Sequence, residues 1–139
     1  MKYLLDTNIC VALIRQKSPA VLQRLVLLKP GDVAISSITL AELVYGAEKS
    51  TKNEENLTAL QQFVLPLEQV TFDQQAAIAY GKIRADLERT GNIIGSMDML
   101  IAANALSLDL VLVTNNVREF SRVQGLVIED WISGAGKSL

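Results

Sequence analysis

YLLDTNIC, residues 3–10, is the stretch of this 139-residue sequence from which the fold can be worked out. Its apolar start predicts a short buried strand, and Asp6 ends that strand. Thr7 and Asn8 follow at once, and both residue types open helices well. The carboxylate at this junction has two interpretations. It is either part of a helix cap or a metal ligand whose partners lie elsewhere in the chain.

Outward from this stretch, short β-type runs alternate with longer runs of helical periodicity. Strands are predicted at residues 2–6, 32–36, 67–71, 110–114 and 125–130. Helices are predicted at residues 8–16, 19–28, 39–50, 55–65, 74–90, 97–108 and 118–123. Asp73 is expected to cap the long fifth helix and Gly91 to end it. This alternation predicts an α/β fold, with a parallel β-sheet flanked by helices on both faces.

The length of the chain suits one domain, and half of its residues are apolar, so it can bury a real core. Residues 1–131 are interpreted as that domain, and residues 132–139 as a flexible C-terminal tail. No apolar run approaches the length of a membrane span, and Asp6 comes too early for a signal peptide. We therefore expect a cytoplasmic protein that has no membrane partner.

Residue types that are missing exclude several kinds of site. The absence of histidine excludes His general bases, His-ligated zinc and the Ser-His-Asp and Cys-His types of catalysis. The single cysteine, Cys10, excludes an intramolecular disulfide, and its apolar surroundings predict a core residue. With 13 basic and 15 acidic residues, the net charge of −2 is not that of a general nucleic-acid coat. A local basic patch or bound cations can still attract nucleic acid.

Four acids lie where strands or loops lead into helices: Asp6, Glu42, Asp98 and Glu119. Glu42 is placed in the first turn of its helix, and a helix is expected to begin at about Asp98. Sites in parallel sheets form at the carboxyl ends of the strands, so these acids can face one crevice. Gathered carboxylates repel one another and need protons or a cation, and oxygen ligands suit Mg²⁺ or Mn²⁺. Such an ion activates water, so a phosphodiester can be cut without histidine.

Helix capping is the alternative explanation for each acid taken singly, because anions are favourable near helix N-termini. Thr39 and Glu42 fit a capping box, and so do Asn116 and Glu119. Ser96 is a candidate cap for the helix that follows it. Capping does not require the acids to share one edge of one sheet, so the four together favour a metal site.

Four blocks of the sequence occur in an order and spacing that is more specific than the short motif LDTN alone. They are LLDTNIC (4–10), ISSITLAELVYGAEKS (35–50), IGSMDMLIAANAL (94–106) and LVTNNVREFSRVQGLVIEDW (112–131). This set resembles the PIN-domain ribonucleases, and more closely the VapC toxins of bacterial toxin–antitoxin pairs. The match runs over residues 2–131.

This resemblance implies a PIN-like fold and an endoribonuclease that uses Mg²⁺ or Mn²⁺ to hydrolyse RNA, with structured RNA such as tRNA among its substrates. It also implies a homodimer and a VapB-like antitoxin whose chain blocks the crevice. The catalytic set carried over is Asp6, Glu42, Asp98 and Glu119. The first three match the family acids and are expected to bind metal. Glu119 replaces the usual Asp, and its role is left open between help with a second metal, an indirect contact with the metal and a helix cap. Thr114 and Asn116 match groups that support the site.

Among the basic residues, Arg118 is the best candidate for a contact with an RNA phosphate, because it lies between Asn116 and Glu119. The aromatic rings of Tyr45 and Phe120 could stack on bases. Packing in the core is the expected use of both.

Two other functions are compatible with such a fold. An aspartyl-nucleophile phosphatase needs a second Asp two residues after the first, but that position is Asn8, and no Lys lies at the end of the fourth strand, VTNN (113–116). The other alternative is a catalytically inactive PIN-like module that binds RNA or protein, since fold does not determine function. The retained acids argue against it, and a test of metal-dependent RNA cleavage separates the two.

Overall fold

The structure, a computed structural model, describes residues 1–133. These residues form five strands: β1 (Tyr3–Leu5), β2 (Val33–Ser36), β3 (Glu68–Val70), β4 (Val111–Val113) and β5 (Ile128–Glu129). They also form seven helices: α1 (Thr7–Ile14), α2 (Pro19–Val26), α3 (Ser37–Glu48), α4 (Asn53–Val64), α5 (Gln74–Thr90), α6 (Ser96–Ser107) and α7 (Val117–Phe120). Residues 134–139, most of the predicted tail, lie outside the described residues.

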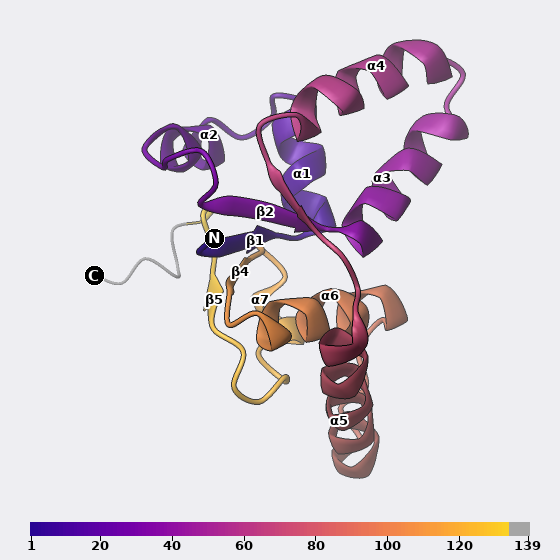
Figure 1. The fold of residues 1–139 in the computed structure, drawn as a ribbon, viewed down its shortest axis with the longest axis vertical. Helices are drawn as coiled ribbons and strands as arrows, with labels where there is room; N and C mark the ends of the chain where they lie inside the picture. Colours follow the sequence, from indigo (N-terminus) through magenta and orange to yellow (C-terminus); the bar gives the residue numbers. More distant parts are fainter. Residues whose placement is uncertain (134–139) are drawn as a thin grey trace.

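The strands run parallel to their neighbours, in the order β3-β2-β1-β4-β5. In the central strand β1, Leu4 pairs with Ala34 of β2 on one side and with Leu112 of β4 on the other. Parallel neighbours cannot be joined by tight turns, so helices cross the faces of the sheet between strands. Figure 1 shows α1–α4 on one side of the sheet and α5–α7 on the other. The predicted parallel sheet with helices on both faces is confirmed.

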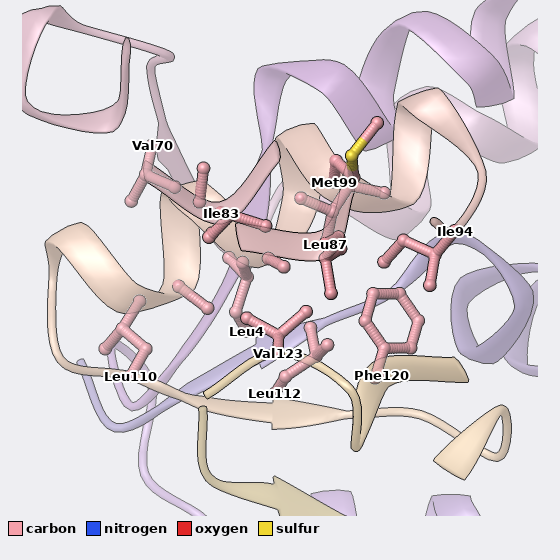
Figure 2. Close-up of a cluster of buried hydrophobic side chains, with 14 of the residues drawn as sticks. Leu4, Val70, Ile83, Leu87, Ile94, Met99, Leu110, Leu112, Phe120 and Val123 are labelled. Carbon is pink, nitrogen blue, oxygen red and sulfur yellow. The ribbon is translucent and has the colours of Figure 1, made fainter. Parts of the chain in front are cut away.

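Two hydrophobic clusters pack on the two faces of the sheet, because successive strand residues point to opposite faces. Leu4 and Leu112 point into the cluster that includes residues of α5 and α6 (Figure 2). Leu5 and Val113 point into the cluster that includes residues of α1 to α4. Cys10 belongs to the second cluster and is fully buried, so its predicted place in the core is confirmed.

Helix α5 begins and ends where the sequence predicts. The Asp73 carboxylate accepts a hydrogen bond from the Ala76 N–H at 3.0 Å and so caps the helix. Gly91 ends it with a φ of 70°, a left-handed conformation that favours glycine.

Helices α3 and α6 begin earlier than the sequence predicts. The Ser36 hydroxyl accepts a hydrogen bond from the Ile38 N–H at 3.0 Å, so α3 begins at Ser37 instead of residue 39. Helix α6 begins at Ser96, and its cap position is Gly95, which has no side chain to cap with. Ser96 is therefore the first helical residue and not the cap.

Helix α2 carries more apolar side chains than it can bury. Val21 is fully buried, whereas Leu22 and Val26 are 52% and 69% exposed, and Leu27, which directly follows the helix, is 80% exposed. Exposed apolar side chains on one short helix are typical of a surface that meets a partner.

At the end of the described chain, the first two residues of the predicted tail form a turn against β5. The N–H groups of Ile132 and Ser133 donate to the Asp130 carboxylate at 3.0 and 3.1 Å. Within residues 1–133, none of the helices has the length and apolar character needed to cross a bilayer.

Candidate active site

The carboxyl ends of β1 and β4 place Asp6 beside Thr114. The Thr114 hydroxyl donates to Asp6 Oδ2 at 2.5 Å, and the Ile9 N–H donates to Asp6 Oδ1 at 2.9 Å. Asp6 is thus the N-cap of α1 and at the same time lies at the edge of the sheet where a site was predicted. The helix-cap interpretation of Asp6 is therefore confirmed, whereas its role as a metal ligand stays a prediction.

Burial controls the charge of Asp6. Asp6 is only 3% exposed, and this burial raises the pKa of its carboxyl above the ordinary value. The hydrogen bonds from Thr114 and Ile9 lower the pKa in part, whereas the charge of Glu42 raises it further. The Asp6 carboxylate is consequently well positioned but costly to ionise without a cation nearby.

Glu42 lies in the second turn of α3, not in the first turn as predicted, because the helix begins at Ser37. For the same reason the predicted capping box with Thr39 does not form. The Glu42 carboxylate instead accepts a hydrogen bond from the Thr7 hydroxyl at 2.6 Å, and that hydroxyl lies 3.3 Å from the Thr39 hydroxyl. Thr7 directly follows Asp6, so this bond holds Glu42 of α3 against the start of α1.

Asp98 lies in the first turn of α6, and its half-buried carboxyl responds to the other three acids. Burial, followed by the charges of Glu119, Asp6 and Glu42, raises the pKa of Asp98 to about 6. Charges act on one another in this way only when they are near neighbours. The structure therefore gathers the four predicted acids at one edge of the sheet.

Glu119 lies on α7, and both of its carboxylate oxygens accept hydrogen bonds. The Gly95 N–H donates to Oε1 at 3.0 Å, and the Asn116 side-chain amide donates to Oε2 at 2.6 Å. The bond from Asn116, followed by the bond from Gly95, lowers the pKa of Glu119. The predicted capping box, in which Glu119 would accept from the Asn116 backbone, does not form. The carboxylate is instead joined to the start of α6.

A short chain of hydrogen bonds connects Glu119 with Asp6. The Asn116 N–H donates to the Thr114 hydroxyl oxygen at 2.9 Å, and that hydroxyl donates to Asp6. The Asn116 side chain holds Glu119 at the same time. Thr114 and Asn116 therefore contact the acids that they are predicted to support.

Close approach of the chain at Gly95 explains why this position has no side chain. A Cβ atom there would lie 3.3 Å from Asp98 Oδ2 and 4.0 Å from Glu119 Oε1. The first distance is tighter than ordinary van der Waals contact, so a larger residue would displace the Asp98 carboxylate.

The other candidate residues differ in their surroundings. Arg118 is exposed on α7, and its guanidinium forms no ion pair within the described residues. Phe120 is fully buried, as expected. Tyr45 is 65% exposed, so the prediction that it packs in the core is wrong. The buried stripe of α3 includes Leu43 and Ala47, and Tyr45, two residues from each, lies on the opposite side of the helix.

The donor set fits a hard cation, although the side chains are not yet arranged around one point. In residues 1–133, no three acidic or cysteine side chains already form a group that could hold a metal ion. Glu42 and Glu119 are engaged in hydrogen bonds with neighbouring groups. Carboxylate oxygens are nevertheless the ligands that Mg²⁺ and Mn²⁺ prefer. Burial, with added effect from neighbouring carboxylates, raises the pKa values of Asp6 and Asp98, and a cation nearby would favour their ionised forms.

Three features of the site were not predicted from the sequence. The contact between Thr7 and Glu42 had only one sign in the sequence, which is that Thr7 directly follows Asp6. Gly95 was signalled only by its place before a helix. Asn104 is fully buried, where its Oδ1 accepts from the Ser36 hydroxyl at 2.6 Å and its Nδ2 donates to the Thr71 carbonyl at 3.1 Å. One amide in the otherwise apolar run of α6 was the available signal.

Comparison with known proteins agrees with this geometry. Residues 3–126 match the PIN domain family. The tRNA(fMet)-specific endonuclease VapC of Shigella flexneri is 47% identical over 131 residues, which are 94% of this chain and 98% of that protein.

Solved structures share the fold over nearly the whole chain. DNA-bound VapBC from Salmonella typhimurium contains a chain with a TM-score of 0.90 and 48% identity, covering 94% of this chain and 98% of that one. VapBC-5 from Mycobacterium tuberculosis, a member of the VapBC family of toxin-antitoxin systems, gives a TM-score of 0.70 at 26% identity. That match covers 92% of this chain and 95% of the other.

Proposed function

Because this chain belongs to the PIN-domain family and, within it, to the VapC ribonucleases, we propose that it is the endoribonuclease toxin of a VapBC-type toxin–antitoxin pair. Its reaction is the hydrolysis of RNA phosphodiester bonds by water, with Mg²⁺ or Mn²⁺ as cofactor. One observation carries the proposal: the charges of Asp6, Glu42 and Glu119 all act on Asp98, so four acids share one site.

Asp6 and Asp98 are the principal candidates to hold the cation, and Glu42 completes the set of ligands. A bound Mg²⁺ or Mn²⁺ would offset phosphate charge and lower the pKa of a water molecule that attacks phosphorus. Support comes from the raised pKa values of Asp6 and Asp98. Burial is the main cause, the charges of neighbouring acids add to it, and a cation nearby would favour the ionised carboxylates. Glu42 and Glu119 must rotate out of their present hydrogen bonds to reach the same ion.

The protein's own contribution is to hold the carboxylates in place before RNA arrives. Thr114 and Ile9 together occupy both oxygens of Asp6, and Thr7 holds Glu42. Groups that are already oriented lose less freedom when the substrate binds, and this lowers the barrier.

Glu119 is assigned a less direct role, because it stands where the family usually has Asp and its carboxylate already joins α7 to Gly95 at the start of α6. It can orient a ligand of the cation or help to hold a second one. Arg118 is exposed one residue before Glu119, and its guanidinium, which forms no ion pair within residues 1–133, can contact a phosphate of the RNA.

tRNA is the substrate class that the relatives favour. The VapC of Shigella flexneri, 47% identical over 98% of its length, is named a tRNA(fMet)-specific endonuclease. Structured RNAs of this kind expose single-stranded loops, whose backbone is accessible to side chains. With RNA as its substrate, the protein is proposed to act in the cytoplasm.

Two protein partners follow from the same family membership. A VapB-like antitoxin is proposed to cover part of α1 and α2, where Leu22, Val26 and Leu27 are exposed. A second copy of the chain is proposed to form a homodimer through a different surface.

The proposal is tested with purified protein and unfractionated tRNA. Cleavage is expected to need Mg²⁺ or Mn²⁺ and to stop in excess EDTA. Asp6→Asn should lower the rate by more than about 100-fold, beyond the range typical for loss of an indirect ligand contact. The matched control is Asp109→Asn, which changes an acid in the turn before β4 and should keep the parent's rate.

Circular dichroism and thermal unfolding of Asp6→Asn show whether the fold survives the substitution. Full activity in excess EDTA would exclude the metal mechanism. Tight RNA binding without cleavage, at any concentration of Mg²⁺ or Mn²⁺, would favour the catalytically inactive binding module instead.

A further inference from the structure

Gly46 lies in the interior of α3, where glycine is an unfavourable residue. Glycine loses more backbone freedom in a helix than alanine does, and it therefore weakens helices. A packing conflict would explain its use, but a Cβ atom built on Gly46 has no neighbour within 4 Å. Within residues 1–133, the fold itself thus supplies no steric reason for glycine at this position.

Gly46 lines a groove that begins at the candidate active site. The groove lies between α1, α3 and α4 and has a volume of about 330 Å³, within the range of ligand sites. Thr7 and Glu42, which form one of the site's hydrogen bonds, are among its lining residues. Glu42, Gly46 and Lys49 share one face of α3 by their spacing of four and three residues. The missing side chain at Gly46 therefore leaves open the floor of a groove that leads away from the acids.

The groove is lined by two cations, Arg15 and Lys49, and by one acid, Glu42. Neither cation forms an ion pair within the described residues. The Lys49 Nζ instead lies 4.9 Å from the ring centroid of Tyr45, which is 65% exposed. Free cations beside an exposed aromatic ring are the elements of a surface that binds single-stranded nucleic acid.

From these observations we infer that the groove binds the RNA nucleotide next to the bond that is cut. The strand passes over Gly46, and its phosphate faces Lys49 and Arg15. Its base leaves the groove and stacks on Tyr45, which does not line the groove but lies beside Lys49. This inference rests on the proposed ribonuclease function and adds the substrate contacts on one side of the acids. Charge favours RNA over a peptide here, because the polar rim at Arg15 and Lys49 is cationic and RNA is a polyanion.

Alanine substitution of two helical glycines tests the assignment. Gly81 is the matched control, because it is exposed in the interior of α5, also has no neighbour within 4 Å of an added Cβ, and does not line the groove. Both Gly46→Ala and Gly81→Ala should raise the Tm by roughly 2–5 °C, since alanine favours the helix. Only Gly46→Ala should raise the KM for unfractionated tRNA, by about tenfold, with kcat within about twofold of the parent. Gly46→Leu should raise the KM further.

The contributions of the Tyr45 ring and the Lys49 charge to RNA binding are tested separately. Tyr45→Ala should weaken binding by about tenfold, and Tyr45→Phe should restore it, because a base stacks on either ring. Lys49→Ala should flatten the salt dependence of RNA binding, whereas Lys52→Ala, an exposed lysine outside the groove, should not. Binding is measured by fluorescence anisotropy with labelled tRNA, in an Asp6→Asn background that cannot cut it.

The possible outcomes separate this inference from the proposed function. If the parent cleaves tRNA and Gly46→Ala keeps the parent's KM and affinity, the groove binds something other than RNA, such as a peptide, and the inference is overturned. If the parent binds tRNA without cleaving it, the tRNA affinities of the parent and the variants alone decide whether the groove binds RNA. If the parent neither binds nor cleaves tRNA, both proposals are wrong.

Discussion

The four acids of the site differ in what holds them, and this difference decides what each substitution should do. Asp6 and Glu119 use both carboxylate oxygens in hydrogen bonds. Asp98 has no hydrogen bond to its carboxyl within residues 1–133, so burial and neighbouring charges control it. Of the four, Asp98 should therefore show the strongest response to pH and to added cations.

Asp98→Asn is expected to stabilise the metal-free protein above about pH 6. Folding raises the pKa of Asp98 from 3.8 to about 6, so the folded state holds the proton more tightly than the unfolded chain does. The parent therefore loses stability as the pH rises through this window, and the loss persists above it. Asparagine carries no charge and should avoid a loss of ~1–2 kcal/mol, after allowance for solvent screening. Urea unfolding in EDTA, at about pH 4 and about pH 8, measures the difference.

Two comparisons complete this experiment. Glu48→Gln, which neutralises an exposed acid on α3, should change the free energy of unfolding little at either pH. Added Mg²⁺ should stabilise the parent more than Asp98→Asn. If Asp98→Asn unfolded well below the parent in EDTA at both pH values, Asp98 would act mainly in capping α6.

Glu119→Gln is expected to lose activity only in part, and rising Mg²⁺ or Mn²⁺ should recover it. Glutamine keeps an oxygen that can accept from Gly95 or Asn116, but it removes the charge. Loss of a group that orients metal ligands, without binding the metal itself, typically costs ~10–100-fold in metal affinity or activity. The rate of tRNA cleavage is measured across a range of metal concentrations, beside Asp6→Asn, which should stay inactive throughout.

Equal inactivity of Glu119→Gln and Asp6→Asn at every metal concentration would make Glu119 a direct ligand. An unchanged rate would leave it only the structural task of joining α7 to α6.

At the scale of elements, one buried amide fixes the position of α6. Asn104 accepts a hydrogen bond from Ser36, the cap of α3, and donates one to the Thr71 carbonyl that follows β3. Helix α6 carries Asp98 and helix α3 carries Glu42. The amide therefore joins the two helices whose acids must meet.

Asn104→Ala is expected to destabilise the protein by ~2–3 kcal/mol. The substitution leaves the buried Ser36 hydroxyl and the Thr71 carbonyl without this partner, and buried polar groups without partners are costly. Chemical unfolding at constant m-value measures the change. Ser107→Ala, which removes one partly buried hydrogen bond to the Asn104 carbonyl, is the control and should cost under about 1 kcal/mol. Equal losses for the two variants would show that the amide is unimportant.

At the scale of the whole molecule, we expect a homodimer. Large apolar side chains outside α2 are exposed, including Ile78, Ile93 and Met97 at 49%, 48% and 46%. Surface of this kind can be covered by a second copy of the chain. Static light scattering at micromolar concentration should give the mass of two chains. A clean monomer over the same range would remove the homodimer from the proposal.

Local features of the sequence were sufficient to predict the order of the elements and the class of fold. The apolar run before Asp6 and the cap and stop of α5 at Asp73 and Gly91 act within a few residues, so they can be seen in the chain itself. Because parallel strands end at one edge, the same local pattern predicted that the acids would meet. It also supplied the blocks that resemble the PIN-domain ribonucleases, and that resemblance is confirmed.

Only the tertiary structure decided which groups contact each acid. Thr7 and Glu42 are 35 positions apart, and Thr114 and Asp6 are 108 apart, so their hydrogen bonds depend on how helices and strands pack. The capping boxes predicted from spacing did not form: α3 begins too early to place Glu42 in its first turn, and Glu119 accepts hydrogen bonds from the Gly95 N–H and the Asn116 side chain. Tyr45 is exposed because packing turned the opposite side of α3, which carries Leu43 and Ala47, toward the core. Local preference selects elements, whereas packing selects contacts between them.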